Sequence, residues 1–92
     1  MRDRFVLWPV YFDRSLSRQQ GRRVALDVAV KNPTVEDIAA AAKKLDLSPE
    51  VEENAAHPSR WWAQEGRVLV EQAGSKTEIL RDVAAELNKK QQ

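Results

Sequence analysis

The stretch that decides the fold reads Arg67-Val68-Leu69-Val70-Glu71-Gln72. Its β-branched and aliphatic residues are typical of a strand. The stretch holds no proline, so each of its residues can donate a backbone hydrogen bond to a neighbouring strand. We therefore expect residues 67–72 to form the central strand of a sheet.

Two further strand candidates precede this stretch. The first reads Phe5-Val6-Leu7-Trp8-Pro9-Val10-Tyr11 and is rich in β-branched and aromatic residues. Because Pro9 cannot donate a ladder hydrogen bond, this strand is expected at a sheet edge or at a bulge. Residues 50–54 form a weaker candidate, in which Val51 is the one strongly apolar residue.

A first helix is predicted to begin at Thr34, directly after Pro33. The Thr34 side chain can cap the helix, and Asp37 stands three residues later as in a capping box. Pro49 is expected to end it. The apolar residues recur at helical spacing at Val35, Ile38, Ala39, Ala42 and Leu45.

A second helix is predicted after Gly74, where Ser75 and Glu78 repeat the capping pattern. Its apolar stripe comprises Ile79, Leu80, Val83, Ala84 and Leu87. The polar residues 88–92 are expected to fray as a tail.

The order of these elements is strand, long loop, helix, strand, loop, strand, helix, within one domain spanning residues 1–92. A helix crossover favours a parallel relation between the first two strands, and the third strand fits between them, antiparallel to both. Both helices would then cover one face. The prediction is an α+β fold with a three-stranded antiparallel sheet in β-α-β-β-α order, a truncated ferredoxin-like or RNA-recognition-motif-like arrangement.

Composition excludes several classes of function. The chain has no cysteine, and His57 is its one histidine, so zinc, haem and disulfide chemistry are not expected. It shows no nucleophile motif, phosphate loop or dinucleotide fingerprint, and we predict neither an enzyme nor a cofactor. Without a signal peptide or an apolar run of about 20 residues, it is expected to be a cytoplasmic monomer that does not insert into membranes.

Basic residues gather near the start of the chain. The net charge is only +1, but residues 1–31 hold seven basic and three acidic side chains, whereas residues 32–56 hold two basic and six acidic ones. In space the first segment could present a positive field to a polyanion. A mixed, solvated surface accounts for the same counts equally well.

The first loop, residues 12–33, contains Ser17-Arg18-Gln19-Gln20-Gly21-Arg22-Arg23. The planar arginine fork can hold phosphate oxygens or a guanine edge, and glycine lets a backbone approach a ligand closely. A loop this long is unusual in a small domain and is often functional. The alternative is a solvated arginine loop with weak surface ion pairs. Residues 24–30 are apolar enough to touch the core.

The second loop, residues 55–66, contains His57-Pro58-Ser59-Arg60-Trp61-Trp62. A cation beside aromatic rings suits RNA, whose bases stack on such rings. The alternative is that the tryptophans pack in the core, and at least one of Trp61 and Trp62 is expected to do so. The same holds for Trp8 and Tyr11. Clear paired aromatics are missing from the sheet, which favours binding by the loops.

Two segments carry a family resemblance. Residues 8–13, followed by residues 17–23, resemble the opening of the archaeal nineteen-kilodalton proteins of the signal recognition particle. Residues 57–62, followed by residues 66–70, resemble the second signature of that family, an aromatic-Pro-x-basic-Trp-Trp loop that enters a strand. The resemblance spans nearly the whole chain in the right order.

The resemblance implies a strand-helix-strand-strand-helix fold that binds signal recognition particle RNA at the adjoining tetraloop tips of helix 6 and helix 8. Clamping these tips preorganises the RNA for the GTPase subunit that binds signal sequences. The RNA-binding residues that it implies are Tyr11, Asp13, Ser17, Arg18, Gly21, Arg22 and Arg23 in the first loop and His57, Arg60 and Trp61 in the second. Lys31, late in the first loop, completes the predicted set.

Two departures and two alternatives stand beside this resemblance. Many relatives carry a lysine-rich tail where this chain has Lys89-Lys90-Gln91-Gln92, and His57 stands where an aromatic residue is common. The alternatives are a different structured-RNA or ribosome-associated protein, and a protein-interaction module that uses an exposed sheet edge.

Overall fold

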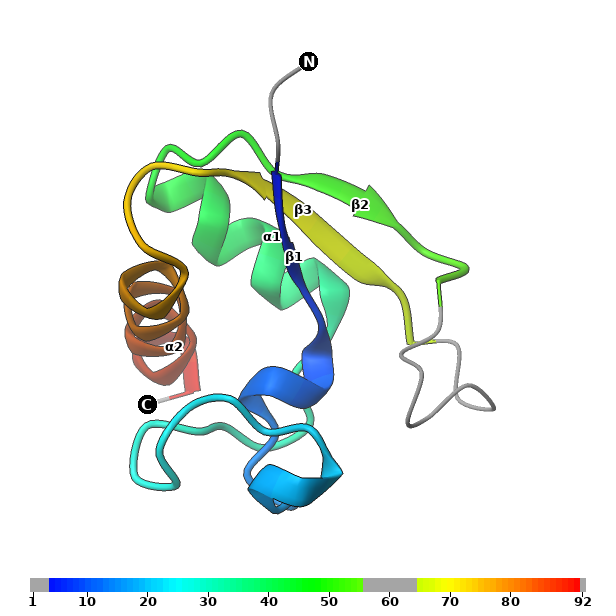
Figure 1. Ribbon diagram of the computed structural model, residues 1–92, viewed down its shortest axis with the longest axis vertical. Helices are drawn as coiled ribbons and strands as arrows, with labels where there is room; N and C mark the ends of the chain where they lie inside the picture. Colours follow the sequence, from blue (N-terminus) through cyan, green and yellow to red (C-terminus); the bar gives the residue numbers. More distant parts are fainter. Residues whose placement is uncertain (1–3, 56–64, 92) are drawn as a thin grey trace.

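The computed structural model describes residues 4–55 and 65–91. Its sheet has the order β1-β3-β2, with β1 at Arg4–Leu7, β2 at Glu50–Glu52 and β3 at Arg67–Glu71 (Figure 1). The central position predicted for residues 67–72 is confirmed. Both edge strands are antiparallel to β3, so they run parallel to each other, as the helix crossover between them predicts.

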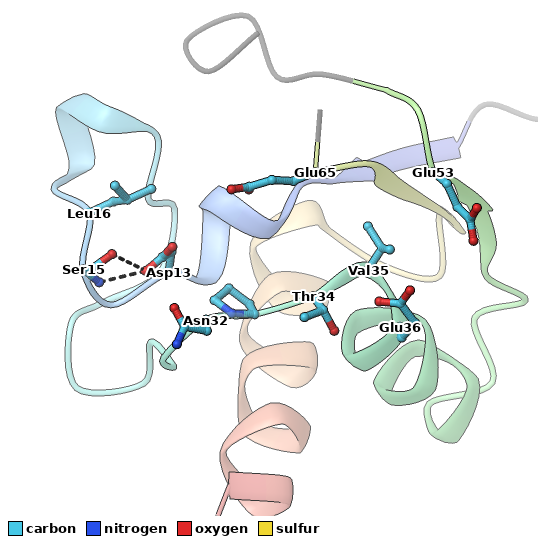
Figure 2. A pocket seen from close by; sticks show the side chains of 10 residues that line it. Asp13, Ser15, Leu16, Asn32, Thr34, Val35, Glu36, Glu53 and Glu65 are labelled. Atoms are coloured by element: carbon cyan, nitrogen blue, oxygen red, sulfur yellow. Dashed lines mark hydrogen bonds between the residues drawn. The ribbon is translucent and has the colours of Figure 1, made fainter. Parts of the chain in front are cut away.

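Two helices cover one side of this sheet. Helix α1 is Val35–Lys44 and α2 is Lys76–Gln91, and both lie beneath the sheet in Figure 2. The Thr34 hydroxyl accepts from the Asp37 amide at 3.1 Å, and the Ser75 hydroxyl accepts from the Glu78 amide at 3.2 Å. The predicted α+β fold in β-α-β-β-α order is confirmed.

The core lies between the sheet and the helices. Val68 and Val70 of β3 are fully buried in it, whereas Leu69 between them is only partly buried on the other face. The alternation is that of a strand with one covered face. The stripe predicted for α2 is buried at all of its positions, Ile79, Leu80, Val83, Ala84 and Leu87.

The first strand is shorter than its sequence indicates. β1 ends at Leu7, and Pro9–Phe12 form a 3-10 turn, η1, with all four residues buried. Proline fits the first position of such a turn because its fixed φ is helical and no amide is needed there. Trp8 before it is extended, with φ −100° and ψ 144°, as a residue before proline prefers. The turn carries the chain from the sheet edge into the first loop.

Helix α1 ends five residues before Pro49, so the predicted stop signal was wrong. Asp46 adopts a left-handed φ of 60°. Its amide donates to the Lys43 carbonyl at 3.1 Å, and the Leu47 amide donates to the Ala42 carbonyl at 3.0 Å. This is a Schellman motif, which satisfies the last carbonyls and directs the buried Leu47 into the core.

Helix α2 continues to Gln91 instead of fraying from residue 88. The Asn88 side-chain amide donates to the carbonyl of Ala84, in its own helix, and to the carbonyl of Val28, in the first loop. The helix end is thus tied to the loop by a contact that the local sequence does not reveal. No helix in residues 4–55 and 65–91 is long and apolar enough to cross a membrane.

Candidate nucleic-acid interface

Backbone hydrogen bonds close the first loop at its stem. Asp13 and Val30 form a parallel bridge. The Val30 amide donates to the Phe12 carbonyl, and the Arg14 amide donates to the Val30 carbonyl, both at 2.8 Å. Farther along, the Arg23 amide donates to the Tyr11 carbonyl at 2.9 Å. The loop therefore folds back against the end of η1.

The apolar part of the first loop reaches the core, as expected. Val24, Ala29 and Val30 are buried and Val28 is partly buried, whereas Ala25 and Leu26 are exposed, Leu26 with 52% of its surface. The loop is thus anchored by its second half, and its first half carries the arginines outward.

A tight turn presents Arg18. Arg18–Gln20 form a second 3-10 turn, η2, capped reciprocally: the Ser17 hydroxyl accepts from the Gln20 amide at 3.3 Å, and the Gln20 side-chain oxygen accepts from the Ser17 amide at 2.9 Å. Gly21 follows with φ 122°, a region that L side chains rarely adopt. Ser17 and Gly21 therefore shape the loop.

Arg22 also supports the loop from inside. It is partly buried, and its Nε donates to the Val24 carbonyl at 2.9 Å while its Nη1 donates to the Leu16 carbonyl at 2.7 Å. The guanidinium thereby joins the two sides of the η2 turn. We therefore expect Arg22 to act by holding the loop in shape; the direct contact with RNA that the sequence indicates for it stays a prediction.

Arg22→Ala is expected to weaken RNA binding by loosening the loop, since two charge-assisted hydrogen bonds worth roughly 1–3 kcal/mol each are lost. Amide hydrogen exchange at Arg23 should become faster, because this amide is held on Tyr11 only while the turn is closed. The dependence of affinity on salt should stay the same, because no phosphate contact is removed.

The matched control is Arg18→Ala, which removes an exposed charge from the same turn. It should reduce the salt dependence of the RNA affinity by the equivalent of about one phosphate contact. The exchange rate of the Arg23 amide should stay unchanged. The positional role of Arg22 would be contradicted if Arg22→Ala behaved as this control does.

Three arginines of the first loop, Arg14, Arg18 and Arg23, are exposed. Within residues 4–55 and 65–91, the ion pairs join Arg4 to Glu50, Arg67 to Glu52 and Lys89 to Glu86, and none involves these three. The arginines of the loop are therefore not neutralised by neighbouring carboxylates in this part of the chain.

Tyr11 and Trp8 are buried, with 5% and 9% of their surface exposed. The guanidinium of Arg23 lies 5.3 Å from the centroid of the Tyr11 ring, and that of Arg67 lies 5.4 Å from a Trp8 ring. Both rings thus serve as supports for a cation. The expectation that they pack inward is confirmed.

Both loops begin and end around one cavity of about 700 Å³, shown in Figure 2. Asp13 and Ser15 line it from the first loop, Glu36 from α1, and Glu53 and Glu65 from the chain on either side of residues 56–64. The bases of the two loops are therefore neighbours. The carboxylates make this cavity unsuitable for phosphate but able to accept hydrogen bonds from amino groups.

Two features hold the walls of this cavity in place. Among the described residues, the side-chain hydrogen bonds of Asp13 end on Oδ1, which accepts from the Ser15 amide at 2.9 Å and from the Ser15 hydroxyl at 2.7 Å. Gly66 has φ 86°, and a Cβ atom there would lie 3.0 Å from the Glu53 carbonyl oxygen and from Val35 Cγ1. Only glycine fits this approach without strain.

The remaining predicted residues divide into two groups. Lys31 is exposed at the loop stem and lines a hollow of about 300 Å³ with Arg14. Arg14 is not in the predicted set, although it stands in the same basic loop, two residues after the apolar run that ends at Phe12. His57, Arg60, Trp61 and the neighbouring Trp62 lie outside the described residues. In the part of the chain that the structure covers, no three histidine, aspartate or glutamate residues could hold a metal ion.

Comparisons with known proteins agree with one another. The family model described as "SRP19 protein" matches residues 6–90. The signal recognition particle 19 kDa protein of Hyperthermus butylicus is 50% identical over 86 residues, which cover 94% of this chain and 82% of that protein. A crystal structure of SRP19 in complex with the S domain of signal recognition particle RNA superposes with a TM-score of 0.87 at 35% identity, covering 90% of this chain and 95% of the other.

A further solved structure also matches this chain. The SRP19 of Pyrococcus furiosus, described as one of two proteins that assemble the ribonucleic core of the particle, superposes with a TM-score of 0.81 at 33% identity. The superposition covers 97% of this chain and 92% of the Pyrococcus furiosus chain. With matches of this extent, the chain belongs to the SRP19 family, the 19 kDa proteins of the signal recognition particle.

Proposed function

We propose that this chain binds the S domain of signal recognition particle RNA and clamps the tetraloop tips of helix 6 and helix 8. The clamp preorganises the RNA for the signal-sequence-binding GTPase subunit of the same particle, in the cytoplasm. A relative of the same fold is seen in complex with that RNA domain. The family is one of non-catalytic RNA-binding subunits, so the prediction that the chain is not an enzyme is confirmed.

The observation that carries the proposal is the set of exposed arginines on a loop held by its own hydrogen bonds. Arg14, Arg18 and Arg23 project from a scaffold that the Arg22 guanidinium and the η2 cap keep in shape. Preorganised cations lose little conformational entropy on binding, so more of the electrostatic attraction appears as affinity. Phosphates are the polyanions that such a surface suits.

The acidic cavity beside the arginines suits contacts with RNA bases, whereas the arginines suit contacts with phosphates. Phosphates are repelled by Asp13, Glu53 and Glu65, whereas the amino groups of unpaired bases can donate to these carboxylates. Tetraloops present such bases, and proteins read RNA mainly in single-stranded loops because the deep major groove is closed to side chains. In this proposal, bases of the hairpin tips face the cavity and phosphates face the arginines. The second-loop residues His57, Arg60 and Trp61 complete the clamp.

A protein-interaction module is the weaker alternative. β-strand addition needs a long open sheet edge, but β1 has four residues and β2 has three. Arg4 of β1 and Glu50 of β2 also pair across the sheet. Nothing in the described residues favours this second function.

The test is a fluorescence titration of S-domain RNA at several salt concentrations. With about five phosphate contacts, the logarithm of the binding constant should fall with the logarithm of salt concentration with a slope of about −4. Replacing the tetraloop of helix 6 alone, or of helix 8 alone, should weaken binding in each case. A flat salt response would contradict the phosphate clamp, and insensitivity to one of the tips would contradict a clamp on both.

Preorganisation has a separate test. The GTPase subunit should bind S-domain RNA more tightly when this chain is already bound, because the RNA has then lost its alternative conformations. Equal affinity with and without the chain would leave RNA binding intact and remove the preorganising role.

A further inference from the structure

A second basic surface lies between the first loop and α2, and the residues that α2 contributes to it are outside the predicted RNA-binding set. A groove of about 400 Å³ runs between Arg18 and Arg23 of the loop and Thr77 and Arg81 of α2. Asp27 is the one carboxylate among its lining residues. Thr77 and Arg81 are four residues apart, so they lie on the same face of the helix, toward the groove.

Lys76, which precedes Thr77 at the start of α2, adds a charge close to Arg23 of this groove. Its Nζ lies 5.3 Å from the centroid of the Tyr11 ring, the same distance as the guanidinium of Arg23. Two cations therefore share one buried ring. Burial, and then the nearby charge of Arg23, hold the pKa of Lys76 below its usual value.

Lys76 and Arg23 carry like charges beside one ring, so they repel each other in the free chain. A lysine at the N-terminus of a helix faces the positive end of the helix dipole. Within residues 4–55 and 65–91, no ion pair joins Lys76, Arg23 or Arg81 to a carboxylate. A phosphate placed between Lys76 and Arg23 would replace their repulsion by two attractions. The charge of this groove therefore suits an anion.

We propose that this groove holds the phosphodiester backbone of the bound RNA, with Lys76 and Arg81 as further RNA-binding residues beside Arg18 and Arg23. The inference rests on the proposed function and extends it from the hairpin tips to the adjoining backbone. The Thr77 hydroxyl can donate to a phosphate oxygen. The apolar floor, which includes Val24 and Leu80, offers no hydrogen bonds to base edges, so the contact is with backbone and independent of sequence.

The first experiment compares two double variants in titrations of S-domain RNA over a range of salt concentrations. Lys76→Gln with Arg81→Gln should weaken binding roughly 10- to 100-fold and reduce the salt slope by about 2. Its thermal unfolding should be unchanged or slightly improved, because like charges are removed. The control, Lys43→Gln with Lys44→Gln, removes the same charge from the last turn of α1. Its RNA affinity should depend on salt concentration almost as steeply as that of the wild type.

The second experiment places the RNA directly. The chain has no cysteine, so Thr77→Cys creates a single attachment site for an iron–EDTA probe that cleaves nearby RNA backbone. Cleavage of S-domain RNA from this position, and none from a Lys43→Cys control, is the expected result.

The outcomes separate the two proposals. If the wild type binds with a steep salt slope but the Lys76 and Arg81 variant matches its control, or if the probe at residue 77 does not cut, the groove is not an RNA site and the loop clamp stands. If the wild type does not bind S-domain RNA, both proposals fail.

Discussion

The variant in which Arg14, Arg18 and Arg23 are all replaced by glutamine is expected to bind S-domain RNA about a thousandfold more weakly than the wild type. Each lost charge-assisted contact to a phosphate costs roughly 1–3 kcal/mol, and 1.4 kcal/mol corresponds to a factor of ten. The three side chains are exposed, so the fold should be unaffected. Fluorescence titration at fixed salt measures the affinity, and circular dichroism checks the fold.

The control for this variant replaces Lys43, Lys44 and Lys89 by glutamine. It has the same net charge, but its substitutions lie near the C-terminal ends of α1 and α2. This control should lose less than about tenfold in affinity for S-domain RNA, because it weakens only the long-range electrostatic attraction. Equal losses in the two variants would mean that the overall charge, and not the first loop, attracts the RNA.

Phe12→Ala is expected to lower the free energy of unfolding by about 3–5 kcal/mol, the usual cost of removing a fully buried phenyl ring. Phe12 is 0% exposed and ends η1, and its carbonyl accepts the Val30 amide that closes the first loop. For a domain whose total stability is of the order of 5–15 kcal/mol, this loss is severe. Urea denaturation followed by circular dichroism measures it.

Leu26→Ala is the matched control, because Leu26 belongs to the same loop but is 52% exposed. Its effect should stay within about 0.5 kcal/mol. A loss below about 1 kcal/mol for Phe12→Ala would show that η1 and the loop stem are not part of the cooperative core.

The elements predicted with the fewest errors are those that depend on local spacing. The stripe of α2 was read from its period, and every one of its residues is buried. Thr34 and Ser75 cap their helices as their positions indicate. The apolar spacing and the capping residues lie within a few positions of the helix turns that they determine, so they can be recognised in the sequence.

Element ends were predicted less well. Pro9 correctly indicated an edge strand, but that it starts a buried 3-10 turn depends on what η1 packs against. The stop at Asp46 depends on a Schellman motif that places Leu47 in the core, and the length of α2 depends partly on a bond from Asn88 to Val28. These contacts join residues that only the folded chain brings together.

The candidate site was also predicted only in part. The arginine-rich loop was recognised from its composition, but the sequence did not indicate which of Arg18, Arg22 and Arg23 would face inward. Arg22 turns inward because the Leu16 and Val24 carbonyls need a donor, whereas Arg18 projects from the η2 turn. The contributions of His57, Arg60 and Trp61 stay predictions.

The order of the elements, the central position of β3 and the presence of a basic loop follow from periodicity, proline and charge, which are properties of neighbouring residues. Which cations face outward, and that Lys76 joins Arg23 on the Tyr11 ring, became visible in the folded chain. Such a site is made by residues distant in the chain, and its electrostatics depend on their distances in space.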